Sequence, residues 1–345
     1  MQGWISRRLR VFAIAGTAAL VLLATGGCSK DDGLEVVVYT ALDQTYSEPI
    51  LDDFEAQTGI RVKVAYDTEA TKTTGLVNRI IAEKAVPRAD VFWNNEVAQT
   101  IVLKNQGLLQ PYESPATERI AARFKDNDGY WTGFAARARV IIYNTDLVTE
   151  PPKSIYDFTK PEWRGDAAIA LPLFGTTATH AAALFEGLGD DAAKRLFRDL
   201  KANDVAILPG NATVRDMVAQ GEFKVGLTDT DDANGAVEDG LPAHWLFPDQ
   251  GENEIGTLLI PNSVCLIKDC PHPEAAKRLI DYLLSPEVEI ALAKRRSMQI
   301  PLNPEVTAPA SVPRIERIKT MDVDFAGLAS RMEACATFIR EEFTP

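Results

Sequence analysis

The sequence is poor in cysteine and histidine. Four Cys and three His occur among 345 residues. Four cysteines are too few for a scaffold held by disulfide bonds, and no Cys-x2-Cys or paired-histidine motif supports a zinc site. Hydrophobic residues make up 46% of the chain and charged residues 25%, as in ordinary globular proteins. Disordered, collagen-like and multi-span membrane proteins do not fit this composition, and the length suits two domains better than one core.

Positive charge and enzyme motifs are also scarce. The chain has 36 Lys and Arg against 49 Asp and Glu, which gives a formal net charge of −13. An acidic chain repels phosphate backbones, so we expect no nucleic-acid partner. The sequence contains no P-loop, no G-x-G-x-x-G after a strand, no H-E-x-x-H and no G-x-S-x-G. We therefore expect neither an enzyme nor a catalytic cofactor.

An apolar run near the start of the chain is too short to cross a membrane. It covers residues 11–23 and follows three arginines, and its roughly 13 residues compare with about 20 for a membrane-spanning helix. Gly26-Gly27-Cys28 comes shortly after it. A positive segment, an apolar segment and small residues in this order indicate a secretory signal. The pattern resembles a bacterial lipoprotein signal, with a single N-terminal anchor helix as the alternative.

This resemblance predicts how the chain is exported and anchored. We expect residues 1–27 to form a signal peptide and Cys28 to carry a lipid. Residues 28–33 would be a polar tether. A lipid on Cys28 would hold the protein at the periplasmic or cell-surface face of a membrane without a transmembrane helix.

Strands and helices are predicted to alternate along most of the chain. The predicted strands of the first part are residues 34–40, 60–65 and 89–93, and its predicted helices are residues 47–58, 73–85 and 96–106. The second part repeats this order with strands at residues 167–171, 205–208 and 223–227. Alternation of this kind is typical of an α/β fold with mostly parallel sheets flanked by helices. Such sheets bind ligands at the carboxyl ends of their strands.

Capping residues and prolines predict several boundaries. We expect Ser47 to cap a helix, Gly187 to stop another, and Pro261 to interrupt a strand-like run at residues 255–266. The later predicted helices are residues 273–284, 286–295 and 325–343.

Three aspartates form the strongest local signal for a binding site. Asp229, Asp231 and Asp232 follow a predicted strand and precede a helix. Carboxylates suit a hard metal cation or an ammonium group. Helix capping is the ordinary alternative for each aspartate alone. Three together repel one another unless something positive lies among them. Asp43 and Glu96 are further candidates because each follows the end of a predicted strand.

Other strand ends carry groups that suit an anion. Gly175, Thr176 and Thr177 begin a predicted helix, where backbone N–H groups and hydroxyls can hold an anion. Asn211 stands at a similar helix start. Arg137 and Arg139 alternate in a strand, so both side chains point to one face and could clamp a carboxylate or phosphate. The three histidines have no motif around them and are interpreted as structural or surface residues.

Residues 36–306 resemble the periplasmic solute-binding proteins of ABC importers, most closely their ferric-iron-binding branch. The segments that carry this resemblance are Val38-Tyr39 and residues 54–62 (FEAQTGIRV), 89–92 (ADVF), 107–109 (GLL), 137–144 (RARVIIYN) and 161–165 (PEWRG). The resemblance implies two lobes joined by a hinge that close over one ligand. Lobe 1 would comprise residues 34–136 and 257–300, and lobe 2 residues 137–256 and 301–345. The implied partners are an ABC permease and its ATPase, and the implied state is a monomer.

The same resemblance assigns roles to particular residues. Asp43 falls where the iron-binding branch has a histidine ligand, and Asn95 or Glu96 falls where it has an acidic ligand. Asp231 and Asp232 replace its pair of tyrosines. The implied ligand is ferric ion with a phosphate or carbonate. The residues matching its anion-binding helix starts are Gly175, Thr176, Thr177 and Asn211, with Arg137 as a further anion contact.

Replacement of the tyrosine pair by aspartates leaves other ligands open. Carboxylates would also grip an amine, so an aminophosphonate is an alternative, as is a sugar phosphate. A hydrolase that uses the aspartates with a metal is a third interpretation, although no nucleophile or histidine accompanies them. Cys265 and Cys270 could close a disulfide loop or simply be buried.

Overall fold

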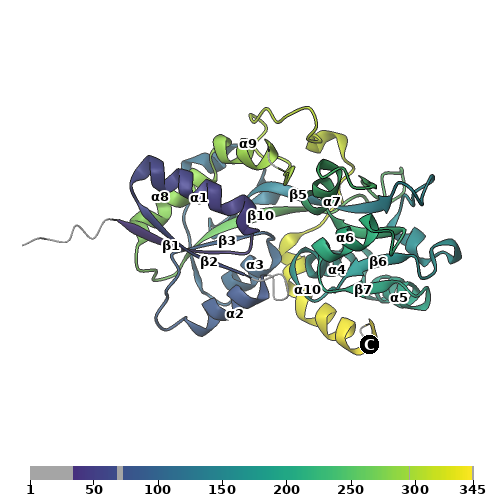
Figure 1. Ribbon diagram of the computed structural model, residues 1–345. Coiled ribbons are helices and arrows are strands. Elements are labelled where there is room, and N and C mark those ends of the chain that lie inside the picture. The colour runs from purple at the N-terminus through teal and green to yellow at the C-terminus, as the bar shows by residue number, and fades with distance from the viewer. Residues whose placement is uncertain (1–33, 68–72, 295, 344–345) are drawn as a thin grey trace, which may run out of the picture. The chain divides into compact units, whose positions relative to one another are not determined.

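The structure is a computed structural model (Figure 1) that describes residues 34–67, 73–294 and 296–343. The predicted signal peptide, the tether and Cys28 lie outside the described residues. The described residues form one compact unit. Within the described part of the chain, no helix combines the length and the apolar character that a membrane crossing requires.

The first part of the sheet is built on a parallel trio of strands. These strands are β1 (Glu35–Thr40), β2 (Arg61–Tyr66) and β3 (Val91–Asn94). β1 lies between the other two, and both pairings are parallel. Apolar β-branched residues such as Val36, Val38 and Val91 are fully buried in it, as expected for a sheet covered on both faces. The connecting helices are α1 (Gln44–Thr58), α2 (Thr74–Ala82) and α3 (Ala98–Asn105).

Two long antiparallel strands join the two parts of the sheet. They are β5 (Thr132–Asn144) and β10 (Leu259–Ile267), and nearly all their residues are buried. The described residues give the strand order β2-β1-β3-β10-β5-β8-β6-β7. The short strands β4 (Leu109–Gln110) and β9 (Ala243–Leu246) pair with β10 and β5 respectively. The predicted break at Pro261 is wrong: β10 continues, and the irregularity is a register shift between Pro261 and Asn262, at which Ala135 of β5 is the extra residue.

The second part of the sheet repeats the parallel arrangement. Its strands are β6 (Ala167–Ala170), β7 (Ala206–Leu208) and β8 (Val225–Asp229). β6 pairs in parallel with β7 and β8, while β8 runs antiparallel to β5. The helices of this part are α4 (Gly175–Leu188), α5 (Asp190–Ala202), α6 (Asn211–Ala219) and α7 (Thr230–Glu238). Helices α4, α6 and α7 therefore begin just beyond the carboxyl ends of three neighbouring strands.

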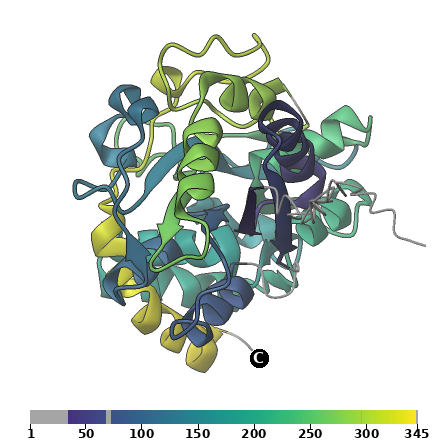
Figure 2. The same ribbon diagram turned by 90° about the vertical axis from the view of Figure 1, so that its left-hand side faces the viewer.

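The C-terminal helices return to both parts of the sheet. α8 (Pro273–Leu283) packs on β1, β3 and β10 (Figure 2), and α9 (Pro286–Lys294) packs on α8, α1 and β5. α10 (Phe325–Phe338) lies against α3 and α4 and continues as a short π-helix, Ile339–Phe343. The described 3-10 helices are Pro115–Arg119, Ala122–Phe124, Ile155–Thr159, Pro161–Trp163 and Ile315–Arg317. The mixed α/β fold predicted from the sequence is confirmed.

Two predicted helix boundaries are wrong. α1 begins at Gln44, and the Ser47 hydroxyl donates to the backbone carbonyl of Asp43 at 3.0 Å from inside the first turn. α4 passes through Gly187 and ends at Gly189, which has a positive φ of 79°. Glycine reaches that backbone conformation without strain, so Gly189 rather than Gly187 ends the helix.

One glycine sets how closely α6 approaches the sheet. A Cβ at Gly226 of β8 would lie 2.5 Å from Cγ1 of Val214, which is closer than any real Cβ contact. The bare backbone at this position therefore lets α6 pack directly on β8. This packing brings the start of α6, at Asn211, beside the end of β8.

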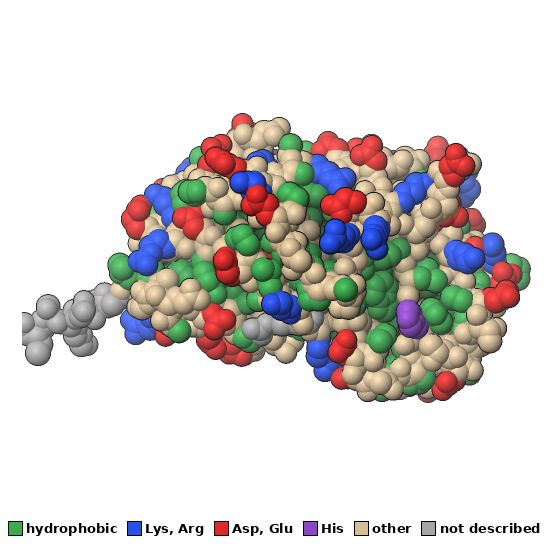
Figure 3. Space-filling view, turned by 90° about the horizontal axis from the view of Figure 1, so that it is seen from above, with side chains coloured by type: hydrophobic (Ala, Val, Ile, Leu, Met, Phe, Trp, Pro, Cys, Tyr) green, Lys and Arg blue, Asp and Glu red, His purple; other side chains and the backbone are tan. Residues whose placement is uncertain are grey.

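The three described cysteines are buried free thiols. Cys265 donates to the carbonyl of Phe92 at 3.7 Å, and no disulfide joins it to Cys270 within the described residues. Burial raises the pKa of Cys270 to about 11 and that of Cys335 to about 12. Figure 3 shows acidic and basic side chains interspersed over one face rather than gathered into a patch of one sign.

Candidate functional site

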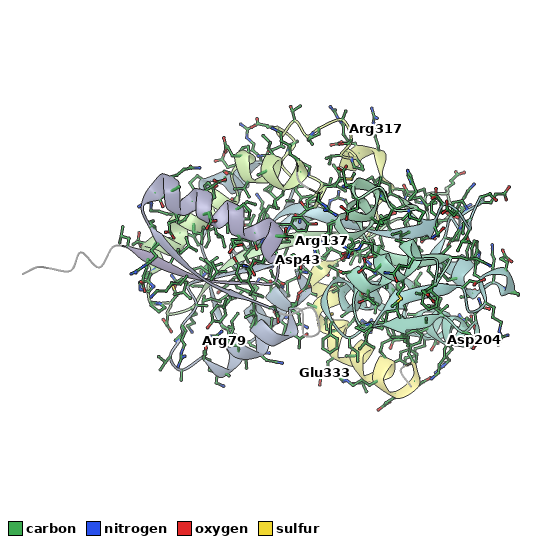
Figure 4. The ribbon with its side chains drawn as sticks, viewed as in Figure 1. Asp43, Arg79, Arg137, Asp204, Arg317 and Glu333 are labelled. Atoms are coloured by element: carbon green, nitrogen blue, oxygen red, sulfur yellow. The ribbon has the colours of Figure 1, made fainter. Side chains whose placement is uncertain are left out.

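The starts of α4, α6 and α7 line one small cavity. It offers ≈ 20 Å³ to water-sized groups, which is room for about one or two water molecules. The predicted site residues that line it are Asp43, Asn95, Arg137, Gly175, Thr176, Thr177, Asn211, Asp229, Asp231 and Asp232. Glu96 is not part of this lining. Figure 4 shows Asp43 and Arg137 beside each other near the start of α1, in agreement with their shared cavity.

The first ion pair of the cavity joins Arg139 to Asp229. These residues stand directly opposite each other in the β5–β8 ladder. Nη1 of Arg139 lies 2.6 Å from Oδ1 of Asp229, and both side chains are almost fully buried. Oδ2 of Asp229 accepts from the Thr176 hydroxyl at 2.5 Å and from the Asn211 amide at 3.0 Å. Both carboxylate oxygens therefore have donors, and the charge is balanced by a fixed guanidinium.

The second ion pair is longer. Arg137 stands two residues before Arg139, beyond the last residue of β8, and its Nη2 lies 3.5 Å from Oδ2 of Asp231. Its side chain is only 2% exposed, and its Nε has no hydrogen-bond partner. When the side-chain amide of Gln299 is oriented to suit its hydrogen-bond partners, its oxygen accepts a hydrogen bond from Nη2 of Arg137 at 3.2 Å. Burial disfavours the charged form of Arg137 and acts to lower its pKa. The negative charges around it have the larger effect and raise the pKa; they belong to Asp231, Asp229, Asp43 and Asp232.

The carboxylates of the first turn of α7 face the cavity together with Asp229. One oxygen from each of Asp229, Asp231 and Asp232 can be chosen so that the three lie within 4.8 Å of one another, a spacing that suits a metal ion. Asp232 also lies 3.6 Å from Nη1 of Arg215. Helix capping does not explain Asp229, because its side chain makes no capping hydrogen bond to α7.

The structure separates the two neighbours Asn95 and Glu96. Asn95 lines the cavity and accepts from the Thr73 hydroxyl at 2.8 Å. The fully buried Glu96 instead accepts from the backbone N–H groups of Ala98 and Gln99, at 2.5 and 3.0 Å, and from the Thr179 hydroxyl at 2.9 Å. Burial raises its pKa. Glu96 thus holds the start of α3 and ties it to α4, a role the sequence prediction did not assign.

The predicted anion contacts bind one another and Asp229. The Thr177 hydroxyl donates to the Asn211 side-chain oxygen at 3.1 Å, and Nη1 of Arg139 donates to the same oxygen at 3.1 Å. Arg137 and Arg139 point to one face, as the strand alternation predicts, and both reach aspartates of the same cavity. Both are buried.

Sequence reasoning missed Tyr46 and Arg215. Tyr46 lies one turn beyond Asp43 on α1 and is half-buried; burial raises its pKa, and Asp231, Asp232 and Asp43 raise it further. The spacing of three residues from Asp43 was the available signal, because helix residues at i and i+3 share a face. Arg215, on α6, had no motif around it.

The described histidines lie outside this cavity. His180 is a buried residue of α4, and burial together with the nearby charge of Arg139 lowers its pKa to about 3. His272 lies 2.9 Å from Asp90, and His244 is largely exposed.

Residues 50–320 match the family described as bacterial extracellular solute-binding proteins. The chain belongs to this family. A relative named iron uptake protein A1, from Synechocystis sp., is 27% identical over 335 residues, which cover 88% of this chain and 90% of the relative.

Solved structures with the same fold include binding proteins for different ligands. Iron-bound HitA from Pseudomonas aeruginosa superposes with a TM-score of 0.80 at 24% identity, over 88% of this chain and 99% of HitA. AfuA from Actinobacillus pleuropneumoniae, solved with fructose-6-phosphate, gives a TM-score of 0.80 at 22% identity, over 90% of this chain and 98% of AfuA. These similarities establish a fold shared with two-lobe periplasmic binding proteins.

Proposed function

We propose that this protein is a lipid-anchored periplasmic receptor that captures a hard metal cation, ferric iron, for an ABC importer. The supporting observation is the cluster of aspartates around one small cavity. Asp231 and Asp232 of α7, with Asp43 from the start of α1, would bind the cation through oxygen atoms. Hard cations prefer such ligands. The name of the Synechocystis relative supports iron as the cargo.

The charge balance of the cavity favours a cation. Four carboxylates line it, from Asp43, Asp229, Asp231 and Asp232. Three guanidiniums accompany them: Arg137, also in the lining, Arg139 and Arg215. Four negative and three positive charges leave a net charge of −1, before a ligand binds.

A small phosphorylated or amine-bearing solute is the second candidate. The fold shared with AfuA favours it, as do three helix starts that face one cavity. Against it, the Thr176, Asn211 and Arg139 donors that would hold a phosphate already bind the Asp229 carboxylate.

The proposed receptor has two lobes that close over the cation. Lobe 1 would comprise residues 34–136 and 257–300, and lobe 2 residues 137–256 and 301–345. β5 and β10 connect the two parts of the sheet, so they are the natural hinge strands. Asp43 would approach from one lobe and the α7 aspartates from the other. Release to a permease and its ATPase would follow reopening, and Cys28 would keep the receptor at the membrane.

The double variant Asp231→Ala/Asp232→Ala tests the cation assignment. We expect its affinity for ferric ion, supplied as the nitrilotriacetate chelate, to fall by more than about 100-fold, since loss of even the groups around metal ligands costs 10–100-fold. The matched control is Asp190→Ala/Asp191→Ala. It removes two acidic residues from the same helical position, the first turn of α5, where both are exposed.

Native mass spectrometry before and after chelator treatment identifies the cargo of the wild-type protein. A metal mass that the chelator removes supports the proposal. Unchanged ferric-ion affinity in the Asp231→Ala/Asp232→Ala variant contradicts it. A chelator-resistant organic mass would instead establish the second candidate.

A further inference from the structure

Three helix starts around the cavity lack side-chain caps. The residues at the N-cap positions of α4, α6 and α7 are Phe174, Gly210 and Asp229, and none of them caps its helix with a side-chain hydrogen bond. Converging helix N-termini attract negative charge. The hydroxyl of Thr176, the amide of Asn211 and the guanidinium of Arg139 add further donors at the same place. This donor set requires an anion.

The anion that fills this donor set belongs to the chain. Oδ1 of Asp229 accepts from Arg139 at 2.6 Å, and Oδ2 accepts from Thr176 at 2.5 Å and from Asn211 at 3.0 Å. The Asp229 side chain is 3% exposed. Its backbone begins α7, yet its carboxylate turns toward α4 and α6 instead of capping its own helix.

We infer that Asp229 serves as a built-in counter-anion, so that the cation binds without an external phosphate or carbonate at Thr176 and Asn211. This inference rests on the proposed function and specifies it further. Arg137 does not provide a replacement anion site, because it is surrounded by the charges of Asp231, Asp229, Asp43 and Asp232. An added anion there would meet a net negative charge.

Thermal unfolding of the metal-free protein tests the inference independently of any metal. Phosphate at about 10 mM should leave the Tm of the wild type unchanged, because its donor set is full. Asp229→Ala leaves a gap beside Arg139 in which phosphate, carbonate or formate can bind, so one of these anions should raise its Tm by about 2 °C or more. Asp229→Asn is the matched control, since its amide fills the same space and should allow no such rescue.

Either of two results overturns the inference. One is a wild-type Tm that rises with phosphate. The other is an Asp229→Ala protein whose Tm none of the three anions raises. If Asp229→Ala does not fold, the wild type and Asp229→Asn still test the inference, because phosphate should raise the Tm of neither protein.

Ferric-ion titration supplies a second readout. Wild-type affinity should change by less than about twofold between phosphate-free buffer and about 10 mM phosphate, whereas Asp229→Ala should gain about tenfold or more from the added anion. Strong phosphate dependence in the wild type overturns the inference. Failure of both proteins to bind ferric ion contradicts the proposed function instead, and the metal-free experiment then decides the role of Asp229.

Discussion

Arg137 and Arg139 lie two residues apart on the same face of β5, and each is paired with an aspartate, yet their surroundings differ. Arg139 stands opposite Asp229 in the strand ladder, 2.6 Å from its carboxylate. Arg137 lies beyond the last residue of β8 and reaches the first turn of α7, where Asp231 is 3.5 Å away. The closed ion pair, Arg139–Asp229, thus lies within the strand ladder, and the open ion pair, Arg137–Asp231, lies just beyond its end.

This difference indicates which pair holds the structure and which pair faces the ligand. The carboxylate of Asp229 has donors on both oxygens. Nε is without a hydrogen-bond partner in both arginines, so the difference between the pairs lies in their distance, which is 3.5 Å for Arg137 and Asp231 against 2.6 Å for Arg139 and Asp229. A short buried pair whose carboxylate has donors on both oxygens resists change, whereas a loosely paired buried charge can exchange its partner when a ligand enters.

The largest expected effect comes from breaking the closed pair. Arg139→Gln leaves the buried Asp229 carboxylate without its counter-charge, which should lower the free energy of unfolding by about 3–5 kcal/mol. Urea denaturation of the metal-free protein measures this loss. Combined with Asp229→Asn, the loss should be smaller than the sum of the two single losses, because the two residues interact directly.

An exposed ion pair provides the control for this prediction. Arg164 pairs with Asp204 at 2.7 Å, close to the Arg139–Asp229 distance, but both side chains are more than 60% exposed. Arg164→Gln should therefore cost only about 0–1 kcal/mol. An equal loss for Arg139→Gln and Arg164→Gln would mean that Asp229 does not depend on Arg139.

Acid should lower the free energy of unfolding through His180, which lies near Arg139 of the closed pair. Burial and Arg139 lower the pKa of His180 to about 3, from 6.5. The folded state therefore keeps His180 neutral between these values, while the unfolded state binds a proton, so stability falls as the pH drops below about 6.5. At about pH 4.5 the loss from this residue should be about 2–3 kcal/mol.

His180→Gln isolates that contribution, because glutamine binds no proton. Between pH 7 and about pH 4.5 the wild type should lose about 2–3 kcal/mol more unfolding free energy than this variant. His244→Gln, at a largely exposed histidine, is the matched control and should keep the wild-type slope. Identical slopes for the wild type and His180→Gln would show that the histidine does not remain neutral beside Arg139.

Periodicity and turn residues predicted most elements, because each depends on neighbours in sequence. α8, Pro273–Leu283, ends one residue before the predicted helix 273–284, and α10 with its π-helical end covers the predicted Phe325–Phe343. The errors fall where two local signals compete. Ser47 could cap a helix or lie within one, and Gly187 was followed two residues later by the glycine that ends α4.

The candidate site was predictable as a place but not as a set of contacts. Parallel strands share the edge at which their carboxyl ends lie, so the polar strand ends were expected to meet. The partner of Asp229 was not predictable, because it depends on the β5–β8 register across 90 residues of sequence. Sequence spacing alone also could not predict whether Asn95 or Glu96 lines the cavity, since this depends on which of two adjacent side chains points into it.

The smallest predicted effect concerns the open pair and has a decisive sign. If Arg137 only balances the acidic residues, a bound cation competes with it for Asp231. Two unit charges about 10 Å apart repel each other by about 1.7 kcal/mol at an effective dielectric constant near 20, so removing this positive charge should strengthen cation binding by at least about tenfold. Ferric-ion titration of Arg137→Gln measures this gain.

Arg198→Gln makes the same change in net charge at an exposed pair with Glu342 and should leave the affinity unaltered. Weaker binding in Arg137→Gln would instead identify Arg137 as an anion contact, as its sequence pattern indicates, and would place an external anion at the open pair.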